Sequence, residues 1–184
     1  PAAGYPLTIY AHGSGGEWMQ VINRGPQEER DDAPEATPGT GPAEWLARRG
    51  VASIGFDFPL HGDRNNPPDT TGLMLYNLTG NAAGTVANFN VSAMELTLLS
   101  RLMLETQLPA QGVDGADLGS QVVARFDPNR LTGMGQSMGS TIGVSWAAID
   151  PRLKAIVLSG SGGSMAEIAT DAVEPFDVQG VLQA

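Results

Sequence analysis

The sequence predicts an α/β fold in which a mainly parallel, doubly wound sheet is flanked by helices. Two observations support this prediction: short, almost uninterrupted apolar runs recur along the chain, and segments with helical patterns separate them. Apolar runs that lack an alternation with polar residues are typical of strands buried on both faces of a parallel sheet. Strands that alternate with helices are joined by right-handed crossovers, which give a layered domain.

The apolar runs expected to form strands cover residues 7–11, 51–56, 131–134 and 155–158. A helix is expected over residues 43–49, because Pro42 stands at its first position and Gly50 follows its basic last turn. Another helix is expected over residues 138–149, where Asp150-Pro151 ends it.

The longest helix is expected over residues 92–107. Ser92 and Glu95 have the spacing of a capping box, which predicts a helix start at Ser92. Met94, Leu98 and Leu102 form a stripe that predicts the buried face of this helix, with Leu99 and Met103 beside it.

Composition bounds the possible functions. A chain of 184 residues has the length of one domain, and 41% hydrophobic residues are enough for a core. No apolar run reaches the roughly 18 residues of a membrane span. A net charge of −10 with a single lysine makes the chain a poor ligand for nucleic acid, and the absence of cysteine excludes disulfides, thiolate nucleophiles and cysteine-based metal sites. The compartment stays open, a secreted or periplasmic location being compatible with the sequence.

Two segments depart from the strand and helix pattern. Residues 25–42 are acidic and rich in proline and glycine, which predicts a surface loop, with a metal or partner site as the alternative. Residues 65–90 combine a Pro-Pro pair and several glycines with scattered apolar residues, so they could form a lid or another segment that covers a site.

The motif with the clearest chemistry is G-Q-S-M-G at residues 135–139, between an apolar strand and a helix of small residues. This G-x-S-x-G pattern in a strand–turn–helix context predicts a nucleophile elbow, in which Ser137 stands above the sheet in a strained conformation. Gly135 and Gly139 avoid the clashes that side chains would cause in so tight a turn. The start of the following helix offers free N–H groups, which favour negative charge beside the serine.

A second glycine-rich segment, H-G-S-G-G at residues 12–16, follows the first predicted strand directly. So little side chain lets main-chain N–H groups approach a ligand, which suits an oxyanion hole. The N–H of Met138 would supply one donor, and that of Ser14 or Gly15 the other. A phosphate-binding loop is the alternative, but neither the P-loop nor the dinucleotide-binding pattern is present.

With these motifs the sequence resembles the α/β-hydrolase superfamily, and within it serine esterases and lipases near the dienelactone-hydrolase and prolyl-oligopeptidase-like branch. The resemblance rests on Y-A-H-G-S-G-G at 10–16, F-D-F-P-L-H-G-D at 56–63, and D-P-N-R at 127–130 leading into the serine motif. It implies a triad in the chain order serine, acid, histidine, and no cofactor or metal.

The sequence departs from that family pattern because its only histidines, His12 and His61, both precede Ser137. Both are interpreted as loop supports together with Gly13, and Asp57 and Asp63 are interpreted in the same way; the alternative for His61 is the catalytic base. Candidate acids after the fourth strand are Asp171, Glu174 and Asp177, none of them in a convincing context. We therefore expect the central part of a hydrolase domain, incomplete at both ends. Its base and acid are expected from sequence beyond residue 184, on the same chain or on a companion chain.

The predicted function is that of a carboxylic ester hydrolase that forms an acyl-enzyme on Ser137, with a small-molecule or lipid ester as substrate and little activity in the 184 residues alone. A peptidase or acyltransferase would share the same nucleophile, and a catalytically silent binding module would lack the histidine. An apolar acyl pocket and ordinary core remain equal readings for a further set of side chains, namely Trp18, Met19, Leu73, Met74, Tyr76 and Met165.

Overall fold

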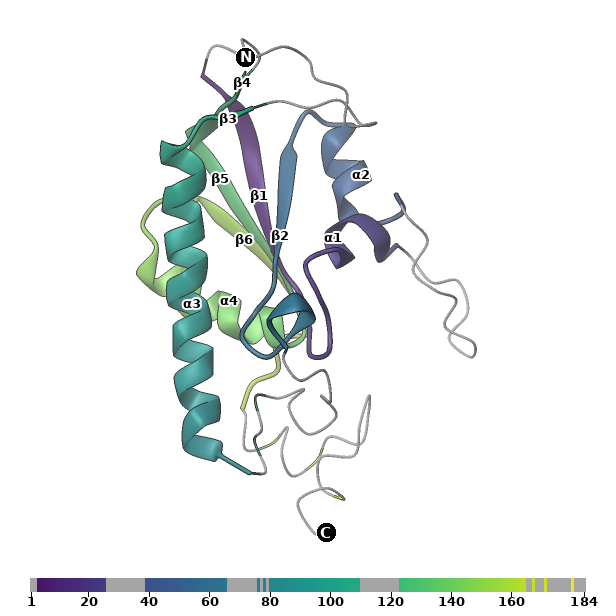
Figure 1. Ribbon diagram of the computed structural model, residues 1–184, viewed down its shortest axis with the longest axis vertical. Coiled ribbons are helices and arrows are strands. Elements are labelled where there is room, and N and C mark those ends of the chain that lie inside the picture. Colours follow the sequence, from purple (N-terminus) through teal and green to yellow (C-terminus); the bar gives the residue numbers. More distant parts are fainter. Residues whose placement is uncertain are drawn as a thin grey trace.

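The computed structural model describes residues 3–25, 39–65, 76, 78, 80–109, 123–164, 167, 171 and 180. Its centre is a parallel sheet of four strands in the order β2-β1-β5-β6 (Figure 1). The strands are β1 (Tyr5–Ala11), β2 (Ala52–Phe56), β5 (Phe126–Gln136) and β6 (Ala155–Ser159). The α/β class and the four predicted strands are therefore confirmed.

The central strand β1 is buried from its second residue onward, as its almost uninterrupted apolar sequence predicts. It pairs with β2 on one side, with Ile9 opposite Ile54, and with β5 on the other, with Ile9 opposite Gly133. Because all four strands are parallel, their carboxyl ends meet at one edge of the sheet, where open α/β sheets bind ligands.

Helices flank the sheet on both faces. Between β1 and β2 the chain forms α1 (Gln20–Asn23) and α2 (Pro42–Ala47), which lie beside β2 in Figure 1. The helices α3 (Ala82–Glu105) and α4 (Met138–Ile149) contact each other and pack against β5. The direction of strand order reverses between the first crossover and the later ones, so right-handed crossovers place these two pairs of helices on opposite faces.

The predicted start of the long helix was wrong. α3 begins ten residues before Ser92, and its N-terminal cap is Asn81, whose side chain accepts a hydrogen bond from the N–H of Gly84 at 2.8 Å. Ser92 is instead fully buried inside the helix, where its hydroxyl lies 2.7 Å from the hydroxyl of Tyr76. Residues 82–90 of the segment expected to cover a site are thus the first turns of α3.

The predicted buried face of α3 was also wrong. Met94, Leu98 and Leu102 are each more than half exposed, and the face packed inward is the one that carries Ala93 and Leu96. Beside the exposed stripe lies a shallow groove of about 510 Å³, lined by Phe56, Glu95, Leu98, Leu99, Arg101, Leu102 and Glu105.

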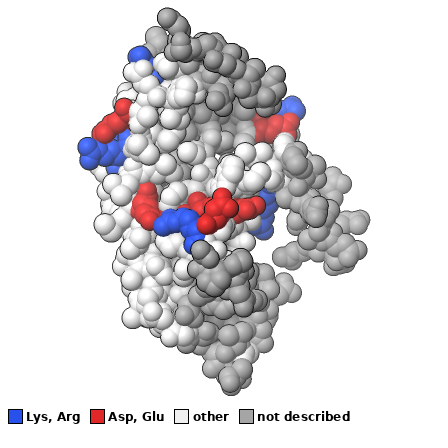
Figure 2. Space-filling model, in the orientation of Figure 1, with Lys and Arg blue, Asp and Glu red and all other residues white. Residues whose placement is uncertain are grey.

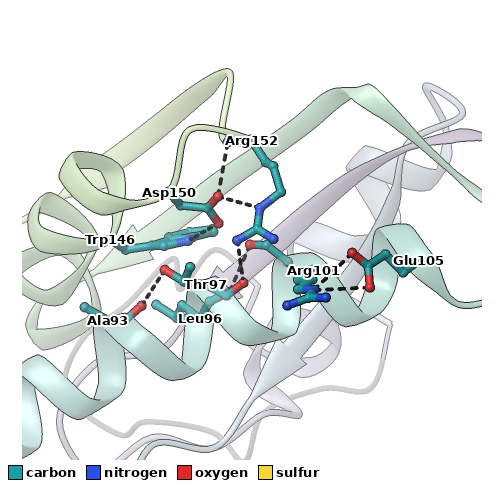
Figure 3. Close-up of polar contacts among 9 residues, drawn as sticks. Ala93, Leu96, Thr97, Arg101, Glu105, Trp146, Asp150 and Arg152 are labelled. Carbon is teal, nitrogen blue, oxygen red and sulfur yellow. Dashed lines mark hydrogen bonds and ion pairs between the residues drawn. The ribbon is translucent and has the colours of Figure 1, made fainter.

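The contact between α3 and α4 is fixed by one buried acid, Asp150, at the end of α4 (Figure 3). Its carboxylate accepts hydrogen bonds from the indole of Trp146 at 3.1 Å and from the guanidinium of Arg152 at 2.8 Å. The same guanidinium donates to the main-chain oxygen of Thr97 on α3 at 2.9 Å. Burial alone would raise the pKa of Asp150, but the hydrogen bonds, that of Arg152 foremost, outweigh it and hold this pKa below its ordinary value.

The remaining connections are short or lie mostly outside the described residues. A 3-10 turn, η1 (Gly62–Arg64), follows β2, and the antiparallel pair β3 (Leu108–Pro109) and β4 (Val123–Ala124) precedes β5. Residues 26–38 of the predicted acidic loop and residues 66–75 of the possible lid are not among the described ones.

Figure 2 shows one face of the molecule, on which acidic and basic side chains lie next to each other. The described residues form ion pairs that include Arg64–Glu95, Arg101–Glu105 and Arg48–Glu44. None of the helices that the structure describes is long and apolar enough to cross a bilayer. The expectation that the chain binds no nucleic acid stays a prediction.

Candidate active site

Ser137 occupies a sharp turn between β5, which ends at Gln136, and α4, which begins at Met138. Its φ of 52° and ψ of −120° lie in a region that residues other than glycine rarely adopt. Such strain persists only where the surroundings hold it, and it is concentrated at functional sites. Ser137 is also half-exposed, whereas Met138 and Gly139 directly after it are buried.

Close packing of α4 against β1 requires the glycines of the motif. A β-carbon on Gly139 would come within 2.2 Å of the carbonyl oxygen of Ala11, and one on Gly135 within 2.7 Å of the carbonyl oxygen of Gly139. Both obstacles are main-chain atoms, so neither can move aside cheaply. The two glycines therefore allow the helix to start immediately above the sheet, as the motif predicts.

The strained turn is held from the neighbouring strand β6. The N–H of Ser137 donates to the carbonyl oxygen of Ser159 at 2.8 Å. The buried hydroxyl of Ser140 donates to the same carbonyl at 2.8 Å and accepts from the N–H of Ser159 at 2.9 Å. The hydroxyl of Thr141 donates to the carbonyl of Ser161 at 2.6 Å. These polar links attach the first turn of α4 to the end of β6.

Three main-chain N–H groups near Ser137 have no acceptor among the described residues: those of Ser14, Gly15 and Met138. Met138 is the first residue of α4, where an N–H has no partner within the helix. Ser14 and Gly15 lie in a tight turn closed by the N–H of Gly16, which donates to the carbonyl of Gly13 at 3.0 Å. The structure thus leaves available the donors that the sequence assigned to an oxyanion hole.

His12 supports the glycine-rich loop from a fully buried position. Its Nε2 accepts a hydrogen bond from the N–H of Phe58 at 3.2 Å, which places the ring proton on Nδ1, and Nδ1 donates to the carbonyl oxygen of Gly13 at 2.7 Å. Burial lowers the pKa of His12 to about 4, although the hydrogen bond to Gly13 opposes this effect. His12 is therefore a neutral ring at neutral pH, with both nitrogens engaged.

His61 is also enclosed, with 3% of its surface exposed. Its Nδ1 donates to the carbonyl oxygen of Pro59 at 2.9 Å, and its ring packs against those of His12 and Tyr76 at 5.2 and 5.3 Å between centroids. The hydroxyl of Ser137 forms no hydrogen bond with either histidine. The structure does not bring the nucleophile candidate and the histidines together.

The other candidates divide between core, surface and residues that the structure does not describe. Tyr76 is buried and takes part in the ring cluster with His61, whereas Trp18 is 39% exposed and Met19 half-buried. Asp171 is exposed. The remaining candidates lie outside the described residues: Leu73, Met74, Met165, Glu174 and Asp177. Of the six residues considered for an acyl pocket, Tyr76 thus belongs to the core.

One set of contacts was missed by sequence reasoning. The N–H groups of Trp18 and Asp63 both donate to the carboxylate of Asp57, at 2.6 and 3.2 Å. The donors are main-chain groups, which any residue type supplies, so no side-chain pattern identifies them. Asp57 itself is interpreted from the sequence as a loop support, but without these partners.

Comparisons with known proteins agree with the fold. No protein-family model matches the chain, and no curated protein matches its sequence. Among solved structures, a "putative acetyl xylan esterase" from Bacteroides fragilis superposes with a TM-score of 0.53 at 13% sequence identity. The match covers 83% of this chain and 36% of that chain. At this identity the likeness shows a shared α/β architecture, and this chain spans about a third of the length of the protein it resembles.

Proposed function

We propose that the chain carries the nucleophile and the oxyanion hole of a serine hydrolase that acts on carboxylic esters. The observation that supports this most is the conformation of Ser137: a serine with φ of 52° at the carboxyl edge of a parallel sheet, immediately before a helix. Neither packing nor turn formation requires serine at such a position, and a strained serine beside unpartnered N–H groups is what acyl transfer needs.

In the proposed reaction, the Oγ of Ser137 attacks the ester carbonyl carbon while a base takes the hydroxyl proton. The carbonyl oxygen becomes an oxyanion, which accepts hydrogen bonds from the N–H of Met138 and that of Ser14 or Gly15. Collapse of this intermediate breaks the bond to the alcohol oxygen, which leaves with a proton, and water then hydrolyses the acyl-enzyme. Each oxyanion donor contributes roughly 3 kcal/mol to lowering the barrier.

The two histidines of these 184 residues are engaged in the fold around the loop. His12 holds its ring proton on Nδ1 and uses both nitrogens in the loop, and His61 is enclosed between aromatic rings. We therefore assign the base to a histidine, and the orienting acid to an Asp or Glu, outside these 184 residues. The esterase-like neighbour supports an ester substrate by analogy of fold alone.

The test is reaction of the complete protein with a fluorophosphonate probe, followed by hydrolysis of p-nitrophenyl acetate. Labelling at Ser137, and loss of both labelling and about 10⁴-fold of the turnover in Ser137→Ala with an unchanged melting temperature, would support the proposal. Ser161→Ala is the matched control, because this half-buried serine contributes only its main-chain carbonyl to the site. A complete protein that binds no probe would instead favour a catalytically silent binding module.

The substrate scope needs a separate comparison. Turnover of acetyl and longer acyl esters, of peptides, and of esters in the presence of acceptor alcohols distinguishes a carboxylic ester hydrolase or lipase from a peptidase or acyltransferase. The elbow is common to all of these enzymes.

A further inference from the structure

Two consecutive residues after β2 hold the two ends of the glycine-rich loop. At the near end, the N–H of Phe58 donates to Nε2 of His12. Two residues beyond the far end, which is Gly16, the carboxylate of Asp57 accepts a hydrogen bond from the N–H of Trp18 at 2.6 Å. Ser14 and Gly15 lie between these two attachment points, so the direction of their N–H groups depends on both.

The main chain of Trp18 is held at both its N–H and its carbonyl group. A β-carbon on Gly55, in β2, would come within 1.9 Å of the carbonyl oxygen of Trp18. The main chain of Trp18 therefore lies directly on β2, and its N–H reaches the carboxylate that follows the same strand. This arrangement gives the main chain after the loop a defined position. The residue Trp18 is nevertheless 39% exposed.

The carboxylate of Asp57 is itself held by main-chain groups. The residue is 9% exposed, and its second oxygen accepts the N–H of Asp63 at 3.2 Å. Gly62, at φ of +50°, lies against it, because a β-carbon there would come within 2.4 Å of the carboxylate. The guanidinium of Arg64 donates to the main-chain oxygen of Asp57 and pairs with Glu95, so it does not neutralise this carboxylate directly.

We propose that Asp57 is a positioning residue for the oxyanion hole: through the N–H of Trp18 it holds Ser14 and Gly15 where their N–H groups meet the developing negative charge. This inference rests on the proposed function. Donors placed in advance act mainly on the transition state, so their displacement lowers kcat while KM changes little. A residue that served only stability would not produce this separation.

The experiment compares Asp57→Leu with Asp57→Asn and Glu105→Gln in the complete protein. Leucine approximates the shape of aspartate without an acceptor, so kcat on p-nitrophenyl acetate should fall about 10- to 100-fold with KM within about twofold. Asparagine keeps an oxygen for the N–H of Trp18 and should recover most of the rate. Glu105→Gln removes an equal charge from α3, where the side chain is exposed and pairs with Arg101, and should leave kcat unchanged.

A second readout addresses the oxyanion directly. The serine oxygen adds to the carbonyl carbon of a trifluoromethyl ketone, and the charged adduct resembles the reaction intermediate. The affinity of the protein for this ketone should therefore fall in Asp57→Leu by the same factor as kcat/KM. If Asp57→Leu does not fold, Gly62→Ala displaces the carboxylate without removing it and should give the same separation of kcat from KM.

The inference is overturned if a folded Asp57→Leu, or failing that Gly62→Ala, keeps the wild-type kcat and ketone affinity. This outcome is distinct from failure of the proposed function, which would appear as wild-type protein without Ser137-dependent labelling or turnover.

Discussion

Gly13 faces the side chain of Gln136 across the site: a β-carbon on Gly13 would lie 2.3 Å from Oε1 of Gln136 and 3.2 Å from Cβ of Ser137. The residue before the nucleophile and the first glycine of the loop thus occupy adjoining space. A methyl group at position 13 would have to displace the end of a flexible side chain, and it would still touch the serine.

We predict that Gly13→Ala lowers kcat by about 10-fold or more while KM stays within a few-fold, because a shifted loop misplaces its donors. The double variant with Gln136→Ala tells the two contacts apart. Recovery of kcat in the double variant would trace the loss to the glutamine, and continued loss would trace it to the contact with Ser137. Esterase kinetics of the complete protein measure both, and a change confined to KM would show that the loop only binds substrate.

Gly139→Ala should destabilise the fold by at least about 1–3 kcal/mol, because the new methyl group meets the main-chain oxygens of Ala11 and His12 within 2.4 Å. The free energy of unfolding in urea measures this. Gly163→Ala is the control, since among the described residues its β-carbon would meet nothing closer than 3.9 Å, and it should change stability little. Equal stability of the two variants would contradict the close approach of α4 to β1.

The lowered pKa of His12 predicts that the fold loses stability in mild acid. Its pKa is about 4 in the folded protein and about 6.5 when exposed, so between these pH values the unfolded chain binds a proton that the folded chain does not. The free energy of unfolding should therefore fall as the pH decreases from about 6.5 to 4, by about 3 kcal/mol at most from this residue. Urea unfolding across this range, compared with His12→Gln, measures the effect.

NMR provides a direct check of the protonation state of His12. The imidazole resonances of His12 can be assigned by their loss in His12→Gln and titrated by NMR. A His12 signal that titrates near 6.5 would contradict a buried neutral ring.

Asp150→Ala should lower the free energy of unfolding by about 1–3 kcal/mol, because Trp146 and Arg152 both lose their acceptor at the contact with α3. Glu105→Ala is the control: its ion pair with Arg101 on the same helix face is largely exposed and contributes about 0.5 kcal/mol or less (Figure 3). Because the pKa of Asp150 is lowered in the fold, its contribution is present above pH 3.8 and is lost as the pH falls further. Thermal or urea unfolding at neutral pH distinguishes the two variants.

The strands could be predicted from nearly continuous apolar runs, which in β1 correspond to burial on both faces, with Thr8 as a buried polar exception. The start of β5 could not, because it carries Asp127, Asn129 and Arg130, and the carboxylate of Asp127 accepts the N–H of Asn129 in a local turn-like contact at 2.9 Å. Polar residues are tolerated at this end since the strand enters the sheet there and is only partly buried.

The buried face of α3 could not be predicted because serines lie in the core while leucines and a methionine of the same helix are exposed. Ser92 and Ser100 are fully buried, and each hydroxyl has a partner, Tyr76 for the first and the carbonyl of Leu96 for the second. A hydroxyl that bonds inside the protein behaves like a small core residue, which a count of apolar positions cannot reveal. Ser92 and Glu95, whose spacing resembles a capping box, therefore lie in the middle of the helix and not at its start.

Much of the candidate site could be predicted because its residues are local in sequence: the turn at Ser137 and the glycines around it form one continuous motif. His12 and Asp57 could be interpreted as loop supports, but their partners could not be predicted, because the contacts join residues 39 and 46 positions apart through main-chain groups. The pattern of side chains along the sequence does not indicate such main-chain contacts.

The links from α4 to β6 also set an order of formation. Ser140 and Thr141 reach carbonyl groups 19 and 20 residues further along the chain, and the N–H of Ser137 donates to the first of these carbonyls. A nascent chain in which β5 and α4 have left the ribosome but β6 has not cannot make these bonds. The bonds that hold the turn at Ser137 can therefore form only after translation has passed Ser161.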